Sequence, residues 1–257
     1  MRPSSGVELG KMKISPVRSA ALAVLALLLI PAGAAATVYE LGQTHTPVTA
    51  PVCPTNLPLA QCTIILARST AVETIRDGTA YPTTVRKPGR IVAFTVGLSE
   101  LSTNRSTRKT LIHDQDLRWG GTVQVEITVL RQYGKKSKHS FKVVAASPSY
   151  HVEPYLGTVV QIPLTTTLPV NKGDVVALTT PTWAPVLSIL QSSKKFAYRQ
   201  SRRANCANPP NTPQAQTTIG QKAAYKCNYP GTRVEYSVTE VSSTPFPKNY
   251  VHAPDHP

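Results

Sequence analysis

The sequence predicts an all-β fold, an antiparallel β-sandwich of jelly-roll-like kind, preceded by an N-terminal signal helix. Short runs rich in Val, Ile and Thr recur along the chain, and several of them alternate apolar with polar residues. Residues that favour turns separate these runs. Beyond the N-terminal segment no stretch shows a 3.6-residue apolar period, so the strands are expected to follow one another without intervening helices.

The N-terminus has the three parts of a secretory signal peptide. Basic residues precede an uncharged apolar run at 20–30, and small residues follow at 32–36. We therefore predict a signal peptide over 1–36, with cleavage after Ala34 or Ala36. Translation could start at Met12, which would give a basic region of more usual length.

A retained membrane anchor is the alternative for this segment. The uncharged stretch 19–37 is interrupted by Pro31 and Gly33, whereas a spanning helix needs about 20 predominantly apolar residues. Cleavage is the favoured interpretation, so the chain is expected to be secreted and to have no membrane span after cleavage.

The charge balance points to an anionic partner. The chain of 257 residues carries 28 Lys and Arg against 13 Asp and Glu, a net charge of +15. Loss of residues 1–36 removes four basic residues and one acidic residue, which leaves +12. Such a charge favours an anionic cell-wall polymer or glycan. Export and the absence of a recognised motif argue against nucleic acid as the partner.

Proline and polar residues mark the limits of one predicted domain at 60–245. A stretch with four prolines makes 37–59 an expected extended arm, and the polar segment 246–257 an expected flexible tail. The expected strands between these limits lie at 63–67, 71–75, 90–98, 122–130, 141–146, 158–164, 174–179 and 232–241.

Individual strands carry further information. The alternation in 122–130 predicts one buried and one solvent-exposed face, with Glu126 on the exposed side, and Glu235 is placed in the same way in 232–241. Pro163 confines 158–164 to a sheet edge or a strand end, because proline lacks the N–H that a central strand needs. Residues 186–191 are the candidate for a short helix.

The run 168–178 is similar to the late hairpin of tumour-necrosis-factor-like and complement-type jelly rolls. The chain also resembles a family of uncharacterised exported bacterial proteins over roughly residues 60–241. The residues that carry this resemblance are 87–91, 129–131, 170–178, 181–187, Cys206 with 227–229, and 233–237. The resemblance implies a secreted single-domain β-sandwich and no assigned activity.

An even number of cysteines in an exported chain favours disulfides. Four cysteines allow three connectivities, and we favour Cys53–Cys62 with Cys206–Cys227 because each pair closes a local loop. A metal site is disfavoured, because no Cys-x-x-Cys occurs and no histidine lies at ligand spacing from a cysteine.

Trp183, between two prolines, is the first candidate for ligand binding. An exposed tryptophan could stack on a sugar ring, and the alternative is a core residue that closes one end of the sandwich. The other candidates are basic residues that could form an electrostatic footprint or simply a solvated surface: Lys135, Lys136, Lys138, Arg202 and Arg203.

No catalytic motif is present, and no cofactor is expected. His113, Asp114 and Asp116 are weak candidates for a loop cation site, and an exposed turn is the favoured alternative. A glycosidase would need two carboxylates across a cleft, and the sequence marks no such pair.

We therefore expect a secreted, non-enzymatic β-sandwich that binds anionic or carbohydrate polymers of the cell envelope. The alternatives are a self-associating structural or interaction protein and an unrecognised hydrolase. A large exposed apolar patch would favour self-association, and a pocket with two facing carboxylates would favour the hydrolase.

Overall fold

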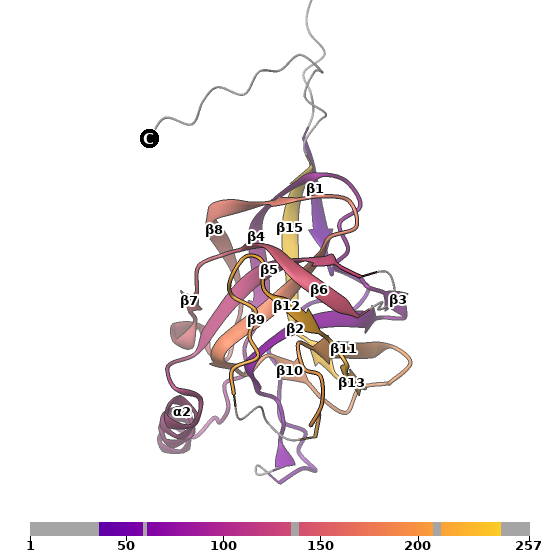
Figure 1. Ribbon diagram of the computed structural model, residues 1–257. Coiled ribbons are helices and arrows are strands. Elements are labelled where there is room, and N and C mark those ends of the chain that lie inside the picture. Colours follow the sequence, from indigo (N-terminus) through magenta and orange to yellow (C-terminus); the bar gives the residue numbers. More distant parts are fainter. Residues whose placement is uncertain (1–35, 59–60, 135–138, 208–211, 243–257) are drawn as a thin grey trace, which may run out of the picture. The chain divides into compact units, whose positions relative to one another are not determined.

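The computed structural model describes residues 36–58, 61–134, 139–207 and 212–242. The predicted signal peptide up to residue 35 and the predicted tail at 246–257 lie outside these ranges. The described chain forms two large antiparallel sheets that share one core, and a separate two-stranded sheet (Figure 1). This confirms the all-β sandwich that the sequence predicts.

The smaller sheet contains four strands in the order β1-β15-β4-β8. They are β1 (Thr37–Leu41), β15 (Tyr236–Ser242), β4 (Gly89–Gly97) and β8 (Val159–Val170). β8 is an edge strand, as the sequence predicts from Pro163.

The larger sheet has β12-β6-β5-β9-β2-β11-β13 as its main path, and short strands add to two of its members. Its strands are β12 (Lys222–Ala224), β6 (Ser140–Ala146), β5 (Gln124–Gln132), β9 (Val175–Ala184), β2 (Leu66–Arg76), β11 (Phe196–Gln200), β13 (Cys227–Pro230), β3 (Thr79–Ala80) and β7 (Tyr150–His151). The remaining elements are the pair β10 (Leu187–Ser188) and β14 (Arg233–Val234), a 3₁₀ turn at Glu153–Tyr155, and helix α2 (Arg105–Trp119).

The predicted strands occur in the predicted places, with two differences of detail. The candidates at 63–67 and 71–75 belong largely to one strand, β2, which contains a register shift near Arg68, whose φ is 48°. The candidate helix at 186–191 is wrong, because Leu187 and Ser188 pair with β14.

The core lies between the sheets and includes Leu66, Ile91, Phe94, Ile127, Leu178, Trp183 and Tyr236, each fully buried. Tyr236 of the smaller sheet donates its hydroxyl to the carbonyl of Val176 in the larger sheet at 3.0 Å. The buried tyrosine therefore joins the sheets through both packing and a hydrogen bond.

The second face of the larger sheet is also covered, which corrects the prediction of a solvent-exposed face on β5. The hydroxyls of Thr70 and Thr128 each lie within 2.8 Å of the hydroxyl of Thr179. Gln216 donates its backbone N–H to Thr70 and accepts a bond from Thr128. Glu126 on this face is only 6% exposed. The alternation was therefore real, but the polar residues contact another part of the chain instead of water.

The N-terminal arm is part of the domain, which corrects the predicted boundary at residue 60. β1 pairs with β15 along its whole length. Beyond β1, Arg76 donates to the carbonyl of Gly42, and Arg233 donates to the carbonyls of Thr46 and Pro47 at 3.0 and 2.7 Å. Buried arginines therefore hold the arm through its backbone, a contact that composition cannot reveal.

These two arginines belong to a buried charge cluster of Glu73, Arg76, Arg233 and Glu235. Arg76 lies 3.3 Å from Glu73 and 4.0 Å from Glu235, and Arg233 lies 3.4 Å from Glu235. All four side chains are at most 3% exposed. Glu235, predicted on a solvent-exposed face, instead accepts the backbone N–H of Thr49 in the arm at 3.1 Å.

Candidate binding site

Helix α2 forms one wall of the candidate site, and sequence reasoning missed it. Among its residues Trp119 alone is buried, so no 3.6-residue apolar period marks the helix. Its ends carry a recognisable signal. The side chain of Asn104 accepts the N–H of Thr107 at 3.0 Å, and Gly120 ends the helix in the left-handed conformation at φ 78°.

Replacing Asn104 by Ala is expected to lower the stability of this helix by about 1 kcal/mol, because the cap supplies an acceptor to an otherwise unpaired N–H. Asn104→Asp keeps that acceptor and serves as the matched control. Hydrogen exchange of the α2 amides measures the effect. Equal exchange rates in both variants would contradict the assignment of Asn104 as the cap.

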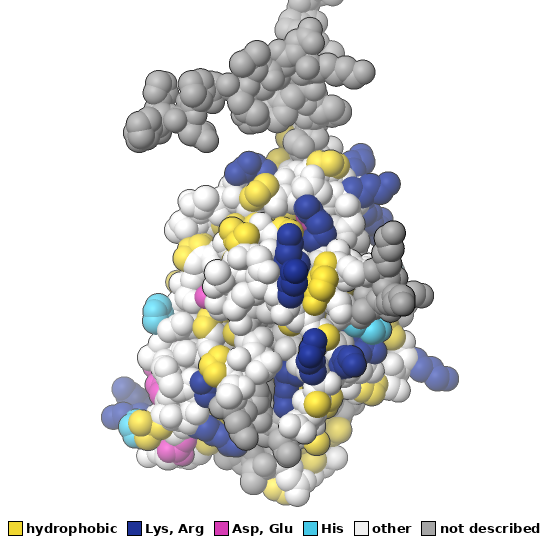
Figure 2. Space-filling view, viewed as in Figure 1, with side chains coloured by type: hydrophobic (Ala, Val, Ile, Leu, Met, Phe, Trp, Pro, Cys, Tyr) yellow, Lys and Arg dark blue, Asp and Glu magenta, His cyan; other side chains and the backbone are white. Residues whose placement is uncertain are grey.

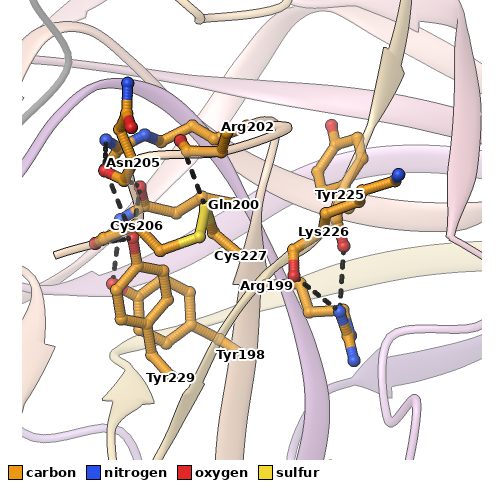
Figure 3. Close-up of a disulfide and its surroundings, with 11 residues drawn as sticks. Tyr198, Arg199, Gln200, Arg202, Asn205, Cys206, Tyr225, Lys226, Cys227 and Tyr229 are labelled. Carbon is orange, nitrogen blue, oxygen red and sulfur yellow. Dashed lines mark hydrogen bonds between the residues drawn. A yellow bond between two sulfur atoms is a disulfide. The ribbon is translucent and has the colours of Figure 1, made fainter.

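A cleft of about 890 Å³ opens between α2 and the larger sheet. Each wall comes from a separate part of the chain, and both disulfides contribute a cysteine. The residues that line it are Cys62, Thr63, Ile65, Ala67, Leu111, Gln115, Arg118, Trp119, Leu187, Ile189, Tyr198, Gln200, Arg202, Cys206, Ala207, Tyr229 and Thr232. The strand β11 side of this lining is drawn with its disulfide in Figure 3.

A hydrogen-bonded tyrosine–arginine group forms the sheet wall of the cleft. The rings of Tyr198 and Tyr229 stack with centroids 4.8 Å apart. Arg202 donates to the Tyr229 hydroxyl at 3.3 Å and to the Gln200 side-chain oxygen at 3.4 Å, and it also donates to the carbonyl of Asn205 (Figure 3). Since each of these side chains is held by its neighbours, the wall is preorganised.

The charged side chains that line the cleft are all cationic among the described residues. Arg118 and Arg202 both line the cleft, whereas no Asp or Glu does so among the described residues. Arg118 lies over the ring of Trp119 at 4.8 Å from its centroid, an arrangement that positions the guanidinium at the cleft wall. Burial raises the pKa of Tyr198 and Tyr229, so both hydroxyls stay protonated, and the Tyr229 hydroxyl donates to the carbonyl of Cys206 at 2.8 Å.

Both disulfides form as the sequence predicts, Cys53–Cys62 and Cys206–Cys227. They indicate that the chain folds in an oxidising environment, extracellular or periplasmic. Within the described part of the chain, no helix has the length and apolar character needed to cross a membrane.

The structure contradicts the role predicted for Trp183. Its side chain is fully buried, and its indole N–H donates to the carboxylate of Asp116 at 2.9 Å. A sugar ring cannot reach it, so the alternative of a core residue is correct. The other tryptophan of the chain, Trp119, is the one that lines the cleft.

The predicted basic residues separate into three groups. Lys135, Lys136 and Lys138 lie outside the described residues. Arg203 is exposed and does not line the cleft. Arg202 is only 5% exposed and belongs to the cleft wall, so it is not the exposed loop residue that the sequence suggested.

The weak cation candidates do not form a site. His113, Asp114 and Asp116 occupy α2 instead of the predicted turn, and neighbouring positions on a helix point in different directions. Asp116 is engaged by Trp183. The described residues contain no group of three or more His, Cys, Asp or Glu side chains that could hold a metal ion.

The surface outside the cleft is also basic. Figure 2 shows Lys and Arg side chains spread over the visible face and acidic side chains at only a few positions. This agrees with the net charge of +15. A charged surface of this kind attracts anionic partners at long range, and the attraction weakens as salt rises.

Fold and cleft together define a class: a disulfide-bonded all-β protein with a largely apolar cleft that two arginines make cationic. No protein-family model matches the chain, and neither a curated protein nor a solved structure shows significant similarity to it.

Proposed function

We propose that this protein is an exported, non-enzymatic binding protein that holds an anionic component of the cell envelope in the cleft between α2 and β11. The observation that carries the proposal is the lining of the cleft, which combines two arginines with no carboxylate among the described residues. The two disulfides support export, because they are typical of an oxidising environment outside the cytoplasm.

The two arginines have different parts in this proposal. Arg118 is exposed on α2 and is free to approach a ligand that enters the cleft. Arg202 is held by Gln200, Tyr229 and Asn205, so its charge stays at a constant position in the wall. Guanidinium groups suit this task because their planar donors match carboxylate and phosphate oxygens.

The surrounding charge has a separate effect on binding. The basic surface raises the local concentration of anionic envelope material and therefore the association rate. The cleft then supplies the contacts that define which group is held. We expect salt to weaken the first effect more strongly than the second, since partly buried ion pairs are screened less.

Co-sedimentation of the purified protein with bacterial cell-wall material, across a salt series, tests the proposal. We expect binding that weakens as salt rises. Arg118→Gln should lower the affinity by roughly tenfold, the order expected for one charge-assisted hydrogen bond. Arg105→Gln is the matched control, because Arg105 is an exposed arginine on the same helix outside the cleft lining.

The outcomes separate cleft binding from nonspecific attraction. Equal losses in Arg118→Gln and Arg105→Gln would contradict the cleft as the site. No sedimentation of the unaltered protein even at low salt would contradict envelope binding altogether.

A further inference from the structure

We infer that the ligand of the cleft is an amphiphile, a molecule with an anionic head and an apolar chain, and this inference rests on the proposed function. The head would lie against the arginines, and the chain against the aliphatic part of the same lining. The inference thus names the chemical class that the cleft selects among anionic envelope components.

The aliphatic residues of the lining carry the first part of the argument. Ile65 precedes β2, Leu111 lies on α2, and Leu187 and Ile189 lie in and after β10. Ile65 and Leu111 are both partly exposed to the cleft. Water in contact with such a surface is displaced favourably by an apolar group. A plain polyanion offers no group that would occupy this part of the cleft.

The position of the charges carries the second part. On α2, Leu111, Gln115 and Arg118 are spaced by four and three residues, so they follow one face of the helix. The aliphatic residue is at the start of this row and the arginine at its end. On the sheet side Tyr198 and Gln200 are two positions apart on β11 and so share one face of the strand, and Arg202 follows just after the strand ends. Each wall therefore combines apolar or aromatic side chains with one arginine.

The size of the cleft carries the third part. Its volume of about 890 Å³ is within the range of roughly 300–1,000 Å³ that small-molecule sites occupy. The dominance of apolar and aromatic side chains with a few polar groups is also typical of such sites. A polymer would have to place a single residue or end group in it, whereas a small amphiphile with one chain matches its volume.

Four probes test the inference with the purified, disulfide-intact protein, and the three amphiphiles among them are used below their critical micelle concentrations. Laurate and dodecyl phosphate have an alkyl chain and an anionic head. Dodecyl maltoside has the same alkyl chain with a neutral head. Polygalacturonate carries negative charges and has no alkyl chain. Titration calorimetry gives the affinities. Tryptophan fluorescence gives the location, because the chain has two tryptophans, and Trp119 lines the cleft while Trp183 is fully buried.

We expect laurate and dodecyl phosphate to bind and to change the tryptophan emission, and dodecyl maltoside to bind at least roughly tenfold more weakly. Arg118→Gln should reduce the affinity for both anionic amphiphiles to about that of dodecyl maltoside. Leu111→Gln should weaken all three chain-bearing probes. Arg105→Gln and Leu117→Gln, which alter exposed residues of α2 outside the lining, should leave every affinity unchanged.

Two different results would overturn two different claims. If polygalacturonate binds in an Arg118-dependent way while laurate and dodecyl phosphate do not bind, the amphiphile inference fails and the proposed function stands. If no anionic probe binds, or if Arg118→Gln behaves like Arg105→Gln, both fail. Circular dichroism of each variant with and without probe confirms that the fold is unchanged.

Discussion

Replacing Arg76 by Ala is expected to lower the free energy of unfolding by about 3–5 kcal/mol, the cost of removing one partner from a buried ion pair. The side chain is fully buried, and it lies 3.3 Å from Glu73 and 4.0 Å from Glu235. Its loss leaves those carboxylates with less compensating charge in a nonpolar environment. It also removes the donor to the carbonyl of Gly42, which holds the arm.

Urea denaturation at pH 7 measures this effect, and Arg90→Ala is the control. Arg90 is an exposed arginine whose side chain bonds to Thr167, so its removal should cost less than about 1 kcal/mol. Proteolysis between residues 42 and 49 should become faster in Arg76→Ala alone. Equal stability losses in the two variants would show that the buried cluster does not hold the arm.

The stability of the protein is expected to fall by about 3 kcal/mol as the pH rises from 4.5 to 7, through the ionisation of Glu73. Burial raises the pKa of Glu73 from 4.5 to about 7, even though Arg76 and Arg233 favour the charged form. The folded state therefore binds this proton more tightly than the unfolded state. The stabilisation is complete below pH 4.5 and is lost as the pH passes through 7.

Glu73→Gln tests the assignment, because the amide imitates the protonated carboxyl. Thermal unfolding between pH 4 and 8 should show a much weaker pH dependence in this variant, and a higher stability than the unaltered protein above pH 7. Burial also raises the pKa of Glu126 and Glu240, so a smaller slope of the same sign should remain. An unchanged pH profile in Glu73→Gln would contradict Glu73 as the titrating group.

The ionisation of Asp77 changes the stability of the protein in the opposite direction, and we expect its protonation to lower the stability at acid pH. Burial opposes its ionisation, but hydrogen bonds from Thr44 and Thr46 of the arm outweigh this and lower the pKa to about 2. Its contribution to stability is present above pH 4 and is lost as the pH falls toward 2. Asp77 and Glu73 together place the expected maximum of stability near pH 4–5, and both carboxylates lie at the attachment of the arm.

The two types of secondary structure differ in how far the sequence could predict them. Alternating strands such as β5 and the edge strand β8 were predictable, because a buried face imposes a period of two and proline excludes a central position. Helix α2 was not predicted from the sequence, because it buries only Trp119 and so has no apolar stripe. Its capping residues Asn104 and Gly120 were the signal that remained.

The candidate site was less predictable than the fold. Arg202 was singled out for its charge, but its place in a hydrogen-bonded wall beside Tyr229 depends on β11 pairing with β13. Leu111 and Arg118 are unremarkable on a polar helix and become a cleft wall only where α2 faces the sheet. Trp183 is of a residue type that can stack on a sugar ring, but its side chain is buried.

The all-β class, the local disulfide pairs and the basic charge can be predicted from the amino-acid sequence, because strand periodicity, loop closure and net charge depend on neighbouring residues or on simple sums. Which polar residues are buried and which residues line the cleft together depends on the tertiary structure. Residues that the fold brings into one cluster or one cleft are far apart in the chain, for example Glu73 and Glu235, or Leu111 and Arg202. Their proximity follows from packing between strands and helix, and packing of this kind has no local pattern that a sequence could display.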